Sequence, residues 1–97
     1  MKTDTSHSLY TRALDLMPGG VNSPVRAFKS VGGEPFFAKR AKGAWIEDVD
    51  GNRLIDLGSG IAVTTIGNSS PPVVAAVRDQ VAEFTHTCFM VTPYEQY

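Results

Sequence analysis

The sequence has one cysteine, Cys88, and no long apolar run. A single cysteine excludes an internal disulfide and suits a reducing compartment. Residues 1–8 are polar, and no apolar stretch of the kind found in signal peptides follows a basic start. No stretch approaches the roughly 20 apolar residues that cross a bilayer as a helix. We therefore expect no signal peptide and no membrane segment, and a cytoplasmic location.

An excess of charge of one sign is also lacking, since 9 Lys and Arg oppose 10 Asp and Glu and the net charge is −1. The basic residues are scattered, and the densest cluster, Lys39-Arg40 with Lys42, is interpreted as the solvated face of a strand. No nucleic-acid partner is predicted. The 97 residues allow at most one domain, and a domain of this size buries only about 60–65% of its unfolded surface.

Motifs for metal or phosphate binding are incomplete. Residues 48–52 alternate oxygen-bearing side chains, but a calcium loop needs a further ligand before its glycine and a glutamate near its end. No Gly-x-Gly-x-x-Gly lies between a strand and a helix, and no P-loop lysine is present. His86 and Cys88 lack the third partner that a metal site or a nucleophile–base pair requires. We predict no metal site and no catalytic residue in this chain.

Local patterns predict an α+β segment. Apolar residues recur with helical spacing at two places: Tyr10, Ala13, Leu14 and Met17, and later Val74, Val77, Val81 and Phe84. The expected order is a helix over 1–17, a loop over 18–34, a three-stranded antiparallel meander over 35–57, a loop over 58–71, a helix over 72–84 and an extended end over 85–97. No complete cofactor domain is predicted.

Caps and turns set the boundaries of these elements. Ser6 or Ser8 is expected to cap the first helix, which Pro18-Gly19-Gly20 ends. Ser69 or Ser70 is expected to cap the second helix. The strands are expected at 36–39, 44–48 and 53–57, with Lys42-Gly43 and Asp50-Gly51-Asn52 as the hairpin turns.

The loop from Pro18 to Arg26 is too rich in proline and glycine for regular structure, yet it ends in one arginine. Two prolines fix φ, and Gly19-Gly20 permits a left-handed step, so the path is semi-rigid. Arg26 offers a planar fork of donors that matches a carboxylate two at a time. We interpret Arg26 as a substrate-carboxylate ligand; a solvated turn residue is the alternative.

Residues 18–28 with the Val31-Gly32-Gly33 turn resemble the start of glutamate-1-semialdehyde 2,1-aminomutases. Residues 48–63 and 84–89 resemble 4-aminobutyrate aminotransferases. Both are class III enzymes that use pyridoxal 5′-phosphate (PLP) and have fold type I, so the sequence is similar to a hybrid joined between Ala44 and Asn52, or to a divergent natural member. The resemblance implies a PLP cofactor, a small amino-acid-like substrate and a homodimer.

The resemblance also implies roles for particular residues. Ile61, in the Gly-Ile-Ala-Val run, would form an apolar wall beside the substrate, and a buried strand position is the alternative. Cys88 and Met90 would line the pocket near the dimer interface. The class commonly has Gly-His-x-His-Pro where this chain has Gly67-Asn68-Ser69-Ser70-Pro71, so roles that rest on those imidazoles do not carry over.

The chemistry of the family shows what the chain lacks. Such enzymes hold PLP on a lysine, place an aspartate at the pyridinium nitrogen and bind the phosphate at a helix N-terminus. The resembled regions carry none of these parts, and the cofactor lysine is expected beyond Tyr97. We therefore predict no catalysis and no specific PLP binding by this chain alone. Its expected role is a substrate-pocket and dimer-contact segment; the alternative is a non-enzymatic binding or assembly module, or an inactive fragment.

Overall fold

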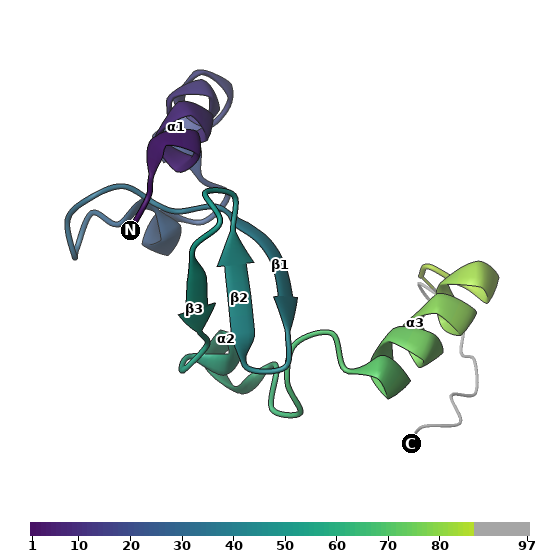
Figure 1. Cartoon of the computed structure of the whole chain (residues 1–97). Coiled ribbons are helices and arrows are strands. Elements are labelled where there is room, and N and C mark those ends of the chain that lie inside the picture. Colours follow the sequence, from purple (N-terminus) through teal and green to yellow (C-terminus); the bar gives the residue numbers. More distant parts are fainter. Residues whose placement is uncertain (87–97) are drawn as a thin grey trace.

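A computed structural model of the chain describes residues 1–86. The elements follow the order α1 (Asp4–Leu16), the 3-10 turns η1 (Pro18–Gly20) and η2 (Pro24–Ala27), strands β1 (Ala38–Lys42), β2 (Trp45–Asp48) and β3 (Arg53–Ile55), the short turn α2 (Ser59–Ala62), and α3 (Pro71–Glu83). Figure 1 shows α1 at one end of a small sheet and α3 standing apart from it. The expected α+β class with a three-stranded antiparallel sheet is confirmed.

Helix α1 ends where the sequence predicts. Met17 is extended, and Pro18 follows it. On the predicted stripe Ala13 is buried, whereas Leu14 is half exposed. The predicted capping residues are wrong: the helix begins earlier, Thr3 is its N-cap without a side-chain bond, and Ser6 and Ser8 lie inside it. The cap comes instead from Asp50, far along the chain, which accepts from the amides of Thr5 and Ser6.

The loop after α1 contains the left-handed step that its glycines predict, with φ of 72° at Gly19 and 68° at Gly20. Gly20 also lies close to α1, because a Cβ there would stand 2.7 Å from the Tyr10 ring. The loop is not wholly irregular, since η1 and η2 are single 3-10 turns, and a proline begins each of them. The rings of Phe28 and Phe36 form a T-shaped pair with centroids 6.0 Å apart. This contact brings together the residues on either side of the segment 29–35.

The sheet has the order β1-β2-β3, and both pairs are antiparallel. The predicted strand bounds need correction: β1 is Ala38–Lys42 rather than 36–39, and β3 ends at Ile55 rather than at residue 57. The pairing of β1 with β2 is irregular between Ala38 and Arg40. The second predicted turn is present, with Gly51 left-handed (φ 80°). The first lies one residue later than predicted: Lys42 still pairs with Trp45, so the loop is Gly43-Ala44, and Gly43 is left-handed (φ 57°). Lys39, Arg40 and Lys42 are exposed, as expected for a solvated strand surface.

Asp48, at the end of β2, is fully buried. Its Oδ1 accepts hydrogen bonds from the amides of Asp50 (3.0 Å) and Asn52 (2.8 Å), and its Oδ2 accepts from Asn52 Nδ2 (2.7 Å). The Asn52 carboxamide also accepts from Lys2 N and donates to Lys2 O. The buried carboxylate therefore shapes the β2–β3 turn, and the turn in turn holds the chain just before α1.

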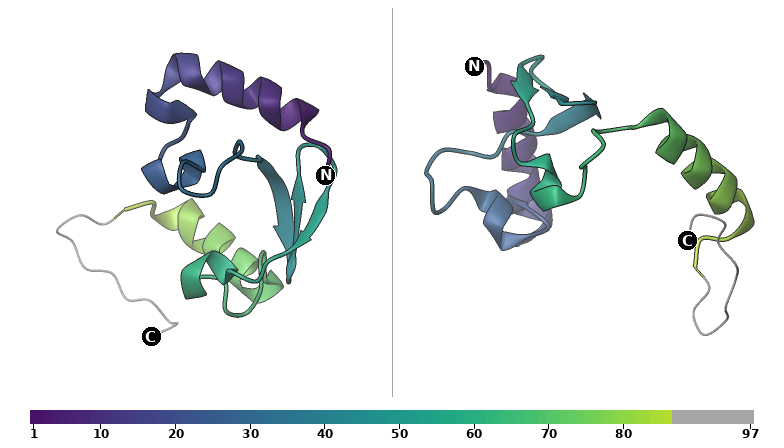
Figure 2. Two further views of the ribbon diagram at one scale, coloured as in Figure 1. Left: turned by 90° about the vertical axis from the view of Figure 1, so that its left-hand side faces the viewer. Right: turned by 90° about the horizontal axis from the view of Figure 1, so that it is seen from below.

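The second half of the described chain departs from expectation in two ways. The loop over 58–71 contains the turn α2, and α3 has no buried residue, so its predicted role as a core helix is not seen here. The predicted serine cap of α3 is also wrong: Ser70 is the N-cap residue but makes no side-chain capping bond. Neither α2 nor α3 contacts another helix or strand within residues 1–86, and both views in Figure 2 show α3 away from α1.

The core is correspondingly thin. The buried hydrophobic side chains of the described residues are Ala13 and Ala27, whereas Leu57, Ile61 and Val63 are at least 80% exposed. The Cα radius of gyration is 16.9 Å, against about 13 Å for a compact domain of 100 residues. Among residues 1–86, no helix is both long and apolar enough to cross a membrane.

Candidate functional site

Arg26 lies at the edge of a pocket of about 440 Å³. The pocket is lined by Ala13, Met17, Gly20, Val21, Asn22, Arg26, Phe36, Phe37 and Ala38. Its wall is apolar apart from Asn22 and Arg26, so an entering ligand meets a single cation. Such a pocket suits a short aliphatic chain that carries a carboxylate.

Local structure orients the guanidinium. Pro24 begins η2, and the Arg26 amide donates to Ser23 O at 3.0 Å, which closes the turn. The Arg26 Nη1 donates to Asn22 Oδ1 at 2.5 Å. The side chain is exposed, and within residues 1–86 its hydrogen-bond partner is neutral, so the guanidinium keeps its charge and has further N–H donors for an anion.

Ile61 lies elsewhere. It belongs to α2, is 94% exposed and has a φ of 56°. The predicted alternative of a buried strand residue is wrong, because Ile61 is neither in a strand nor buried. Since α2 does not contact η2, residues 1–86 alone do not bring Ile61 and Arg26 together. Cys88 and Met90, the other predicted pocket residues, lie outside the described residues.

The backbone around Ile61 is unusual. Ser59, Gly60, Ile61 and Ala62 all have positive φ, from 45° to 65°. Left-handed conformation costs a residue with a Cβ roughly 1–2 kcal/mol, so three of these four residues are strained. Backbone strain of this kind persists only where neighbouring structure enforces it, and it concentrates at functional sites.

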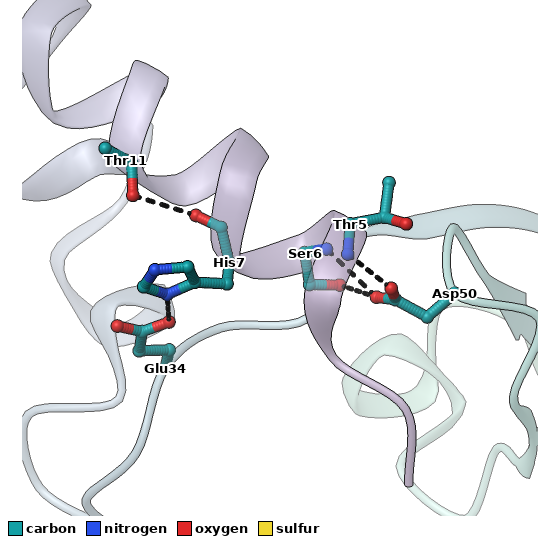
Figure 3. A network of polar contacts seen from close by, with 6 residues as sticks. All are labelled: Thr5, Ser6, His7, Thr11, Glu34 and Asp50. Carbon is teal, nitrogen blue, oxygen red and sulfur yellow. Dashed lines mark hydrogen bonds and ion pairs between the residues drawn. The ribbon is translucent and has the colours of Figure 1, made fainter.

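A polar network that the sequence did not reveal fastens α1 to the sheet (Figure 3). Asp50 accepts from the amides of Thr5 (2.6 Å) and Ser6 (3.0 Å) and from the Ser6 hydroxyl. Ser6 Oγ also accepts from the Phe37 amide at 3.3 Å, so one buried hydroxyl joins α1, the hairpin turn and the approach to β1.

The Asp50 carboxylate is held charged by this network. Desolvation acts to raise the pKa of Asp50, but the hydrogen bonds from Ser6 and Thr5 outweigh it and lower the pKa below its usual value. A carboxylate at the first turn of a helix also interacts favourably with the helix dipole. The sequence signal was present, since the turn at 50–52 carries an acidic side chain, but nothing local shows which helix it meets.

A second contact of α1 is the ion pair of His7 Nδ1 with Glu34 Oε2, at 2.7 Å (Figure 3). The hydrogen bond to Glu34 and the charge of that carboxylate raise the pKa of His7. A raised pKa means that the pair stabilises the fold fully below the ordinary histidine pKa of about 6.5. This contribution is lost as the pH rises through the raised pKa of folded His7. Because the side chains are 65% and 47% exposed, the effect on overall stability is small.

The pairing predicts a specific titration. Glu34→Gln should return the pKa of His7 toward its ordinary value, measured by NMR on the imidazole ring protons between pH 5 and 9. Glu47→Gln is the control, because Glu47 pairs with Arg40 on the sheet and should leave His7 unaffected. An identical His7 titration in Glu34→Gln and the unmodified chain would contradict the pairing.

The residues of this structure do not fit PLP by themselves. The four lysines, Lys2, Lys29, Lys39 and Lys42, are exposed. Helix α3 begins with Pro71 and Pro72, which lack N–H donors. In α1, the amides of Thr5 and Ser6 already donate to Asp50. Within residues 1–86, the N-terminus of neither helix is therefore suited to bind the PLP phosphate. Asp48, Asp50 and Asp56 all accept hydrogen bonds within the chain.

Comparison with known proteins defines the class. The fold matches part of a transaminase with PLP bound, with a TM-score of 0.81 and 33% identity over 96% of this chain and 21% of that one. The architecture is thus that of a segment of a PLP-dependent transferase of fold type I. The family model of class III aminotransferases matches residues 28–97. The chain belongs to the class III aminotransferase family.

Both resembled enzyme types occur among its relatives. A 4-aminobutyrate aminotransferase of Mycobacterium tuberculosis is 82% identical over 63 residues, which cover 65% of this chain and 14% of the relative. A glutamate-1-semialdehyde 2,1-aminomutase of Roseiflexus castenholzii is 52% identical over 85 residues, 88% of this chain and 20% of the relative. The chain therefore spans about a seventh to a fifth of these relatives. The junction between Ala44 and Asn52 stays a prediction.

Proposed function

We propose that this chain is a substrate-pocket and dimer-contact segment of a PLP-dependent aminotransferase or aminomutase. The observation that carries the proposal is the guanidinium of Arg26 at the edge of an otherwise apolar pocket. The remaining parts of the active site, including the cofactor lysine, come from polypeptide outside these residues. Arg26 binds the substrate carboxylate, and Ile61, Cys88 and Met90 form apolar walls.

The substrate in this proposal is a small amino-acid-like molecule. Both 4-aminobutyrate and glutamate-1-semialdehyde carry a carboxylate on a short aliphatic chain, so both match the pocket beside Arg26. The relatives are named for one or the other. A bidentate guanidinium distinguishes a carboxylate from a neutral group but not these two carboxylates from each other.

The contact part of the proposal rests on uncovered apolar surface. Val73, Val77 and Val81 of α3 and Phe84, which follows its last residue, are each between 44% and 57% exposed. A stripe of this kind is typical of a helix that packs against another element. We assign this stripe to the rest of the subunit and to a second copy in a homodimer, and we propose a cytoplasmic location. A non-enzymatic assembly module would use the same surface, and this makes it the second candidate.

A chimaera tests the proposal. Residues 1–97 are joined to the remainder of the M. tuberculosis 4-aminobutyrate aminotransferase, in place of the equivalent segment. We expect a dimer in sedimentation, PLP absorbance and transamination of 4-aminobutyrate or conversion of glutamate-1-semialdehyde. The isolated chain should give no stoichiometric PLP–lysine adduct after borohydride treatment, because its lysines are exposed and no phosphate cradle accompanies them.

The unaltered relative is the control for assembly and activity. A chimaera that dimerises and holds PLP but converts neither substrate would count against the pocket role. A trapped adduct at one lysine of the isolated chain, at micromolar PLP, would refute the statement that the cofactor site lies elsewhere. Because the remainder of the chimaera comes from the 4-aminobutyrate enzyme, conversion of glutamate-1-semialdehyde by the chimaera and not by the unaltered relative would assign that specificity to residues 1–97.

A further inference from the structure

The left-handed turn at Ser59–Ala62 is supported by a side chain outside it, Asp56, in addition to its backbone hydrogen bonds from Ile61 N to Gly58 O and from Thr64 N to Ser59 O. Asp56 Oδ1 accepts from the Ser59 amide at 2.8 Å, at the start of the turn. Asp56 Oδ2 accepts from Asn68 Nδ2 at 2.9 Å. The carboxylate thus bridges the strained turn and Asn68, which follows it along the chain.

Asn68 is itself fixed on the β1–β2 turn. Its amide donates to Gly43 O and its carbonyl accepts from Gly43 N, each at 2.8 Å. Its Nδ2 also lies 3.2 Å from Gly43 O. The neighbouring Gly67 comes so close that a Cβ there would stand 3.0 Å from Gly43 Cα, and its φ is 90°. The backbone of the sheet therefore sets the position of the Asn68 side chain.

The chemistry of a carboxamide suits this position. The side-chain NH2 of asparagine has two hydrogens, and here two acceptors lie within reach, the Asp56 carboxylate and the Gly43 carbonyl. An aspartate of the same shape would have no donor and would repel Asp56. The hydrogen bond from Asn68 is the first cause of the lowered pKa of Asp56, and the Ser59 amide is the second.

We propose that Asn68 is a positioning residue: through Asp56 it fixes the left-handed Ser59–Ala62 turn and thereby the place of Ile61. The link runs from the β1–β2 turn through Asn68 and Asp56 to Ser59. That Ile61 faces a substrate rests on the proposed function, whereas the link itself does not. Asn68 occupies the first histidine position of the Gly-His-x-His-Pro pattern, and a ring N–H there offers one of the two donors.

The test uses NMR on the 97-residue chain, which needs neither substrate nor PLP. In the unmodified chain, Ser59, Ile61 and Ala62 should show the strong intraresidue amide–Hα NOEs of left-handed residues. The Ser59 amide shift should titrate with Asp56 below the ordinary aspartate pKa. Asn68→Asp should abolish these NOEs and move the Ser59 titration to higher pH. It should also speed Ser59 amide exchange several-fold to about tenfold, the effect of losing one hydrogen bond.

Two further variants complete the design. Asn68→His should restore part of the Ser59 protection through its ring N–H. Ser70→Ala, close by in the same loop, should change nothing because Ser70 makes no capping bond. Sheet amides such as those of Glu47 and Ile55 report whether each variant is folded. If Asn68→Asp unfolds the sheet, Asn68→Ser, which keeps the backbone pairing to Gly43, replaces it.

Unchanged NOEs, exchange and titration at Ser59 in a folded Asn68→Asp or Asn68→Ser chain would overturn the proposal. The same holds if the unmodified chain lacks the left-handed signals. Because these readouts involve no catalysis, they fail or succeed independently of the chimaera that tests the proposed function.

Discussion

Replacing Asp48 with alanine is expected to unfold the β2–β3 hairpin of this chain. The change removes a fully buried carboxylate and leaves the amides of Asp50 and Asn52 without their acceptor. Hydrogen bonds to a charged group are worth about 1.5–3 kcal/mol each, so the loss of those from the two part-buried amides amounts to about 3 kcal/mol or more. A thin core offers little reserve against such a loss. Thermal unfolding followed by circular dichroism measures it.

Two variants define the meaning of that result. Asp48→Asn keeps the shape of the side chain but replaces one of the two accepting oxygens with an NH2 group. Its melting temperature should lie between those of the alanine variant and the unmodified chain. Glu47→Ala removes the next carboxylate, which forms a partly exposed pair with Arg40, and should cost about 0–1 kcal/mol. Equal melting of Asp48→Ala and Glu47→Ala would show that the buried carboxylate is not the element that holds the turn.

Arg26→Lys in the chimaera is expected to weaken binding of the carboxylate substrate about tenfold to a hundredfold. Lysine keeps the charge but loses the planar fork, and a charge-assisted hydrogen bond is worth about 1.5–3 kcal/mol. Each 1.4 kcal/mol corresponds to a factor of about ten in affinity. Arg26→Ala should be worse, and PLP binding should be the same in all forms. The measurement is KM and kcat/KM together with cofactor titration.

An analogue in which a neutral amide replaces the carboxylate should bind the unmodified and Arg26→Ala forms almost equally. Arg12→Ala is the matched control, because Arg12 is an exposed arginine on α1 and does not line the Arg26 pocket. If Arg26→Ala keeps the kinetics of the carboxylate substrate and only lowers the melting temperature, Arg26 serves the turn through Asn22 and Ser23. The pocket role would then be wrong.

The elements that the sequence predicted correctly have short-range causes. Proline and glycine end α1 where they stand, and Gly43 and Gly51 take the positive φ that tight hairpins need. β1 was predicted over 36–39 but extends over Ala38–Lys42. The aromatic run at residues 36–37 satisfies strand propensity, whereas the pairing with β2, which reaches Lys42 and Trp45, sets the observed bounds.

The predicted helix caps show where local rules end. Serines near a helix start are common caps, but here Ser6 lies inside α1 and the Asp50 carboxylate takes the capping role. The α2 turn was missed for a related reason: its left-handed residues are unfavourable locally, and the contacts of Asp56 with Ser59 and Asn68 come from residues outside the turn. Sequence patterns over neighbouring residues predict neither the Asp50 cap nor the Asp56–Asn68 contact.

The sequence alone determined the order of helix, loop, meander and helix, the family, and the arginine that the loop presents. The order of elements follows from periodicity and turn chemistry, which act over a few residues, and the family follows from the resemblance of short motifs. Only the tertiary structure decided which polar groups meet, since Asp50 and its α1 partners are 44 and 45 residues apart. It also decided that the apolar faces of α2 and α3 stay uncovered within residues 1–86. Burial depends on what the rest of a fold supplies, and no local pattern encodes that.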